Sequence, residues 1–138
     1  MVIIAAVAGT DTDAAIVSEA MALADAFDDE VHAIHVRTYD SLSDEEKADS
    51  REKSVKERAF DVAAAATADY EQPTVPVGLI GQPAAEILEY AADVETRYIV
   101  IGGQKRSPVG KALFGSKTQQ ILLGATEPVV TVMGPDKA

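Results

Sequence analysis

The sequence has no cysteine, which excludes disulfide bonds, thiol catalysis and thiolate metal sites. It also has no long hydrophobic run, because the apolar start VIIAAVAG is far shorter than the roughly 20 residues that a membrane-spanning helix needs. This start has neither a basic leader nor a small-residue cleavage pattern, so no signal peptide is predicted. We therefore expect a cytoplasmic protein without a membrane partner.

Positive charge is scarce. Lysine and arginine total 12 against 23 aspartates and glutamates, which gives a formal net charge of −11. A field of this sign repels nucleic acid, so we expect no DNA or RNA partner. The acidity has two interpretations that stay open. The carboxylates either solvate helix faces or adapt the protein to high salt, where their mutual repulsion is screened.

The apolar content is sufficient for one domain with a core. Hydrophobic residues make up 47% of the 138 residues, and we expect a single domain over residues 1–138 with a frayed tail over 134–138. Pro76 cannot donate to a strand ladder, which places its strand at a sheet edge. Five segments have the pattern of β-strands: Val2–Val7, Val31–Val36, Thr74–Ile80, Tyr98–Ile101 and Pro128–Met133.

Helical patterns separate these strands. Four helices are predicted: one after the capping residues Thr10, Asp11 and Thr12, one from a capping box at Ser43 and Glu46 to about Ala68, one starting at Pro83, and one over 116–123. The alternation predicts an α/β fold, an open parallel five-stranded sheet with helices on both faces. In such a sheet a ligand binds beyond the carboxyl ends of the strands, where the winding direction reverses.

A basic, glycine-rich loop follows the fourth strand at this expected ligand position. Its sequence is IGGQKRSPVGKALFGS, from Ile101 to Ser116. No carboxylate occurs between Glu95 and Glu127, and the cations in that interval are Arg97, Lys105, Arg106, Lys111 and Lys117. A positive segment in a negative protein indicates an anion site.

The residues of the loop favour a phosphate as that anion. Gly102 and Gly103 allow the backbone to approach a ligand closely. Gly115 and Ser116 precede a helix, whose free N–H groups and dipole attract negative charge. Neither a P-loop nor a dinucleotide-binding glycine motif is present. A purely structural interpretation, a glycine-rich connection with a capped helix behind it, stays open.

These segments together resemble the universal stress protein family. After the fourth strand, its nucleotide-binding members have a glycine, two residues, a second glycine, nine residues, and then Gly-Ser or Gly-Thr. This chain has Gly102, two residues, Lys105, nine residues, and then Gly115 and Ser116. The opening AVAGT, the segment GQPAAEIL and the closing PVVTV also resemble the family, so the similarity covers the whole chain.

The resemblance implies a flavodoxin- or Rossmann-like fold with strand order 3-2-1-4-5. It also implies that ATP or ADP, with or without Mg²⁺, binds between strands 1 and 4. By position, the ribose and phosphates would be surrounded by Gly102, Gln104, Lys105, Gly115, Ser116 and Thr118, with added charge from Lys117. The adenine and ribose end would be lined by Ala6, Val7, Ala8 and Val36, with Ile101 beneath.

Two positions depart from the family pattern. Ala8 stands where the family has an aspartate, so a carboxylate that could meet the ribose or a metal is missing. Lys105 replaces the second glycine of the signature. Its ammonium group either pairs with a phosphate or closes the pocket, and the two departures bear directly on whether a nucleotide binds.

Catalytic residues have less support. His32 and His35 are three apart in a predicted strand, so they point to opposite faces and do not share a metal. Asp11 and Asp13 can hold Mg²⁺ through phosphate oxygens, but helix capping is the favoured role. We expect no enzyme of high turnover, and slow ATP hydrolysis is the most that the sequence supports.

Two functions stay open. The first is a nucleotide-binding regulatory protein of the stress response, whose bound ATP changes its partners. The second is a homodimeric interaction or protective protein without a nucleotide. A flavin carrier is disfavoured, because few aromatic residues lie near the loop to sandwich the ring. In a 3-2-1-4-5 sheet the last strand is an edge, and we expect dimerisation through it. The predicted interface is Val129, Val130, Thr131, Val132 and Met133.

Overall fold

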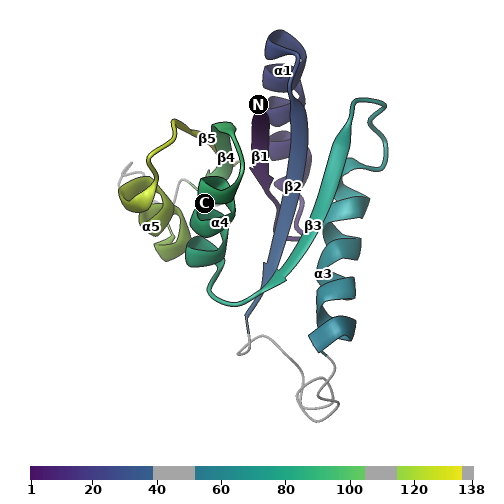
Figure 1. Cartoon of the computed structure of the whole chain (residues 1–138), viewed down its shortest axis with the longest axis vertical. Helices are drawn as coiled ribbons and strands as arrows, with labels where there is room; N and C mark the ends of the chain where they lie inside the picture. Colours follow the sequence, from purple (N-terminus) through teal and green to yellow (C-terminus); the bar gives the residue numbers. More distant parts are fainter. Residues whose placement is uncertain (39–51, 105–114, 135–138) are drawn as a thin grey trace.

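The computed structural model describes residues 1–38, 52–104 and 115–134, which form strands and helices in alternation (Figure 1). The elements in chain order are β1 (Val2–Ala6), α1 (Asp13–Phe27), β2 (Glu30–Arg37), α3 (Glu52–Thr67), β3 (Thr74–Ile80), α4 (Pro83–Asp93), β4 (Thr96–Gln104), α5 (Ser116–Gly124) and β5 (Val129–Gly134). None of the helices in these ranges has the length and apolar character that crossing a membrane would require.

The five strands form one parallel sheet of order β3-β2-β1-β4-β5, which confirms the predicted fold class and strand order. β1 lies at the centre, with Ile3 beside Val31 of β2 and Tyr98 of β4. β3 and β5 are the two edges, and Pro76 lies in β3 as expected. The winding direction reverses between β1 and β4, so the carboxyl ends of these two strands flank the switch point.

The sheet separates two apolar cores. One side of β1 packs with residues of α1 and α3, while the other side packs with residues of α4 and α5. Residues of β1 alternate between the two cores: Ile3 and Ala5 belong to the first, and Val2, Ile4 and Ala6 to the second. Every residue of β1 is buried, which explains the continuous apolar run at the start of the sequence.

One strand is longer than predicted, and one predicted helix start is not tested. β4 continues beyond Ile101 to Gln104, because Gly102 and Gly103 still pair with Val132 and Met133 of β5. The capping box at Ser43 and Glu46 lies outside the described residues, and the described part of α3 begins at Glu52.

The expected side-chain cap of α1 is wrong. Thr12 occupies the N-cap position but makes no capping hydrogen bond with its side chain. Its hydroxyl instead shares a hydrogen bond of 2.7 Å with the hydroxyl of Thr10. The loop before α1 is therefore held by other groups, which are described with the candidate site.

Candidate functional site

A cavity of about 230 Å³ opens at the carboxyl ends of β1 and β4. It lies at the switch point of the sheet, where α1 and α5 both begin. The residues that line it come from these four elements and their loops: Ala6, Ala8, Thr10, Thr12, Ile16, Gly102, Gly103, Gly115, Lys117 and Thr118. A ligand cavity is expected at this place in an open α/β sheet.

The cavity brings together residues that are far apart in the sequence. Six of the residues that sequence analysis assigned to a nucleotide lie in its wall: Ala6, Ala8, Gly102, Gly115, Lys117 and Thr118. Sequence analysis gave no ligand contact to Thr10, Thr12 and Ile16, which also line it. Thr10 and Thr12 lie in the loop after a strand that ends at the switch point, which is the signal that could have identified them, whereas Ile16 lies in the first turn of α1.

Several other predicted site residues are not among those that line this cavity, and their ligand contacts stay predictions. Val7 is 3% exposed and belongs to the core under α1 and α3. Ile101 is buried in the opposite core, and Val36 packs against that core. Ser116 is exposed on the first turn of α5 and does not line the cavity. Gln104 ends β4, whereas Lys105 lies outside the described residues, so its proposed contact stays a prediction.

The start of α5 forms one wall of the cavity. Gly115 is the N-cap, with φ −64° and ψ 162°, and it has no side chain to cap this end of the helix. A Cβ atom on Gly115 would meet nothing within 4 Å, so the space beside it is open. The first N–H groups of the helix have no intrahelical acceptor and are available to an anion.

Thr118 links α5 to the sheet through a hydrogen bond. Its hydroxyl donates a hydrogen bond of 2.9 Å to the carbonyl of Gly102, and the residue is 5% exposed. A hydroxyl has one proton, so this bond leaves Thr118 with acceptor capacity only. The bond fixes the position of α5 relative to the end of β4, and thereby the width of the cavity.

Lys117 places a cation in the cavity wall. The side chain is half-buried, and it makes no ion pair within the described ranges of the chain. Burial lowers the pKa of Lys117 below its usual value, and the negative charge of Asp13 partly opposes this shift. A half-buried ammonium group without a counter-ion is costly, and an anionic ligand would relieve that cost.

Asp13 holds the loop between β1 and α1. Its carboxylate accepts hydrogen bonds from the N–H of Ala8 at 2.8 Å and from the N–H of Gly9 at 2.7 Å. The residue is 8% exposed, whereas Asp11 on the same loop is exposed. Sequence analysis offered Asp13 as a cap or a magnesium contact, and it did not foresee these bonds to the preceding loop. The signal was a carboxylate placed four residues after a turn glycine.

The two histidines have structural partners on opposite faces of β2, as their spacing predicted. The Nδ1 atom of His32 lies 2.7 Å from the hydroxyl of Tyr90, and its Nε2 atom lies 2.8 Å from Oε1 of Glu30. His35 donates from Nδ1 to the carbonyl of Val7 at 2.9 Å. Within the described residues, no group of three His, Asp or Glu side chains could hold a metal ion.

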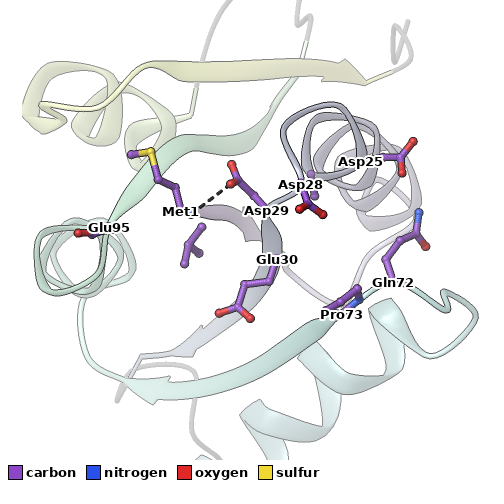
Figure 2. Close-up of a pocket in the computed structure, with 10 residues that line it drawn as sticks. Met1, Asp25, Asp28, Asp29, Glu30, Gln72, Pro73 and Glu95 are labelled. Atoms are coloured by element: carbon purple, nitrogen blue, oxygen red, sulfur yellow. Dashed lines mark ion pairs between the residues drawn. The ribbon is translucent and has the colours of Figure 1, made fainter.

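A larger cavity, of about 500 Å³, lies at the opposite, amino-terminal ends of the strands (Figure 2). Five carboxylates line it: Asp25, Asp28, Asp29, Glu30 and Glu95. The negative charge of these side chains repels a phosphate, although this cavity is the larger of the two. The charges here are partly paired, because Arg97 and the amino group of Met1 both contact the carboxylate of Asp29.

Comparisons with known proteins agree with this fold. The model of the universal stress protein family matches residues 1–133. Among solved structures, the universal stress protein from Archaeoglobus fulgidus is similar, with 24% identity, a TM-score of 0.64, and coverage of 94% of this chain and 96% of that one. The comparison with curated proteins finds no match.

Two further structures contain adenine nucleotides. A universal stress protein in complex with cAMP is 19% identical, with a TM-score of 0.64 and coverage of 98% of each chain. The Archaeoglobus fulgidus protein in complex with dAMP is 20% identical, with a TM-score of 0.60 and coverage of 94% of each chain. At these identities, the likeness shows a shared fold.

Proposed function

The chain belongs to the universal stress protein family, and from this premise we propose that it binds ATP or ADP in the cavity between β1 and β4. The observation that carries the proposal is the wall formed by Gly115 and Lys117 at the start of α5. Open space, the first N–H groups of a helix and a cation without an ion pair among the described residues meet there, and together they match a phosphate. The cAMP and dAMP complexes of two similar proteins support an adenine nucleotide as the class of ligand.

The size of the cavity indicates which part of the nucleotide it holds. Its volume of about 230 Å³ is below the roughly 300–1,000 Å³ typical of pockets that bury a whole small-molecule ligand. We assign it to the phosphates and the ribose, with phosphate at Gly115 and Lys117. The base would then extend outward past the end of β1, near Ala6 and Ala8.

The same residues support binding and regulation rather than rapid catalysis. Asp13 is buried, both of its oxygens accept backbone hydrogen bonds, and it is not among the residues that line the cavity, so the structure supports an anchoring role for this carboxylate. Any Mg²⁺ would accompany the phosphates. His32 and His35 already bond to neighbouring groups and do not line the cavity. Slow hydrolysis of ATP is the most that this site supports, and a bound nucleotide would act by changing the surface offered to partner proteins.

A substitution at Gly115 tests the proposal. Gly115→Val keeps a backbone conformation that valine accepts, but it places a branched side chain in the open space of the cavity. We expect wild-type protein to bind ATP or ADP by titration calorimetry and the variant to lose binding while its melting temperature is preserved. Gln120→Val, at an exposed position of α5, is the control that should bind normally. Wild-type protein that gives no binding heat at low or molar salt, with or without Mg²⁺, contradicts the proposal.

We further propose that the protein is a homodimer through β5. Among the described strands it pairs only with β4, so its outer N–H and C=O groups have no strand partner in the part of the chain that the structure describes and could pair with a second copy. Its valines are partly exposed, and Leu122 and Leu123 at the end of the preceding helix are exposed by 40% and 89%. Burial of these side chains would favour antiparallel pairing about a two-fold axis.

Sedimentation at micromolar concentration tests the dimer. We expect a dimer for the wild type and a monomer for Val130→Lys, because a lysine within an edge strand discourages pairing with another edge. A monomer in the wild type contradicts this proposal. The alternative function, a dimeric interaction protein without a nucleotide, is favoured by the missing carboxylate at Ala8. It predicts a dimer that gives no binding heat with ATP or ADP.

A further inference from the structure

The loop between β1 and α1 contains an anion that belongs to the protein itself. The N–H groups of Ala8 and Gly9 are consecutive, and both donate to the carboxylate of Asp13, at 2.8 and 2.7 Å. Gly9 has φ 78°, a left-handed conformation that glycine adopts readily, so the chain turns directly after these two amides. Consecutive amides that converge in this way form a nest, which binds phosphate in other proteins. Here Asp13 fills the nest.

This nest lies at the edge of the candidate nucleotide site. Ala8 lines the cavity, and Asp13 is buried behind the same wall. Because both oxygens of Asp13 accept hydrogen bonds from the loop, a ligand phosphate could reach the two amides only by displacing the carboxylate. The loop after β1 is therefore closed to phosphate, whereas the start of α5 on the other side is open.

The carboxylate also changes the charge that a ligand meets. Asp13 is near enough to Lys117 for its negative charge to act on that ammonium group. One wall of the cavity thus contains the ammonium group of Lys117, and the carboxylate of Asp13 is buried behind the opposite wall. Each additional negative charge on a ligand is attracted by Lys117 and repelled by Asp13, so the net gain from extra phosphates is small.

We infer that Asp13 is a specificity-determining residue of this site, which keeps phosphate off the β1–α1 loop and reduces the advantage of ATP over AMP. The inference rests on the proposed function, because it concerns the ligand of the same cavity. It assigns the phosphates to the side of α5, at Gly115 and Lys117.

Titration calorimetry with ATP and AMP tests this inference. Asp13→Asn removes the charge, and Asp11→Asn is the matched control, because it removes the same charge from an exposed position of the same loop. We expect the ratio of ATP affinity to AMP affinity to rise about tenfold in Asp13→Asn, as one close charge pair would give. The ratio should change far less in Asp11→Asn. An unchanged ratio in Asp13→Asn, or an equal rise in both variants, overturns the inference.

A second measurement separates this inference from nucleotide binding. Asp13→Ala empties the nest, and NMR can follow the amide signals of Ala8 and Gly9 as inorganic phosphate is added at constant ionic strength. We expect these two signals to shift in a saturable way in the variant and to stay unchanged in the wild type. Asp13→Ser serves the same comparison if the alanine variant does not fold. If the variant is folded and these two signals do not shift with phosphate, the inference is overturned. This outcome is independent of whether the wild type binds a nucleotide, so it is distinguishable from a failure of the proposed function.

Discussion

The two ends of the sheet differ in whether their buried charges are paired. At the amino-terminal ends of the strands, the larger cavity has five carboxylates, and the most buried of them, Asp29, is paired with Arg97. At the carboxyl ends, the smaller cavity contains Lys117, half-buried and without an ion pair among the described residues. Folding stability explains the first arrangement. The second costs stability, so it indicates a site that a ligand completes.

The largest loss of stability is expected at the paired end. Asp29→Asn should lower the melting temperature by several degrees, because the side chain of Asp29 is 2% exposed and its loss leaves Arg97 without its partner. Asp28→Asn is the control, since Asp28 is exposed in the same turn and asparagine accepts its left-handed backbone, φ 56°. Equal melting temperatures for the two variants would show that the Asp29 pair contributes nothing.

The stabilisation of the folded state by the Asp29–Arg97 pair should decrease at low pH. Arg97 holds the pKa of Asp29 below its usual value, so the pair stabilises the folded state above the unfolded pKa of about 3.9. This contribution is lost as the pH falls through the lower, folded pKa. The difference in stability between wild type and Asp29→Asn should therefore shrink in strong acid. A difference that grows below pH 4 would contradict this assignment.

A substitution of Lys117, at the carboxyl ends of the strands, should change the melting temperature in the opposite direction. Lys117→Met removes a cation that burial disfavours, so we expect the free protein to melt at the same or a slightly higher temperature. Nucleotide affinity should fall by about 1–3 kcal/mol, as for the loss of a charge-assisted hydrogen bond. Calorimetric unfolding and nucleotide titration of one variant measure both effects. A destabilised variant with unchanged affinity would give Lys117 a structural role.

If the proposed nucleotide binds beside Lys117, we expect its affinity to depend on pH in the alkaline range. Burial lowers the pKa of Lys117 in the free protein, and a bound phosphate would raise it again by favouring the ammonium form. Binding is then coupled to proton uptake, and affinity should decrease as the pH rises through the pKa of the free protein. Titrations from pH 7 upward check this, with Lys117→Met as a variant that lacks the dependence.

A smaller effect is expected from the hydrogen bond between Tyr90 and His32, which is also near the paired end. Tyr90→Phe leaves Nδ1 of His32 without its partner and should cost about 1 kcal/mol of unfolding free energy in urea. Tyr70→Phe is the control, because Tyr70 packs against the core under α1 and α3 and its hydroxyl bonds to no described group. Equal costs for the two variants would assign the effect to packing alone.

The smallest effect on stability per residue is expected from the acidic side chains. Residues 1–97 carry 21 acidic and 7 basic side chains, a formal charge of −14. The Debye length falls from about 10 Å at 0.1 M salt to about 3 Å at 1 M, so repulsion among these groups should weaken. We expect the melting temperature to rise over this interval. A flat or falling melting temperature would exclude the interpretation of the acidity as an adaptation to salt.

The fold could be predicted because its signals are local and repeated. The apolar run of β1, the proline in β3 and the alternation of strands and helices each constrain the topology independently. The place of the site follows from the same topology, because the switch point of an open sheet is determined by strand order. Gly102 and Gly115 could thus be assigned to one cavity although they are distant in sequence.

The details of the site could not be predicted, because they depend on which way each side chain points. Val7 is adjacent to two cavity residues, but strand alternation directs it into the core. Asp13 turns back to the amides of Ala8 and Gly9, in a loop where Gly9 has a left-handed conformation. A sequence motif shows that these residues are present, whereas only their geometry shows that Asp13 fills a position that a phosphate could take.

One NMR titration tests the central claim, that the carboxyl ends of the strands bind an adenine nucleotide and the amino-terminal ends do not. ATP is added to uniformly labelled protein while all backbone amide signals are followed. We predict saturable shifts at Gly102, Gly103, Gly115 and Lys117, with no shift at Asp28, Asp29 or Glu95. Signals that stay unchanged at the carboxyl ends, or shifts concentrated around Asp29, would contradict the claim.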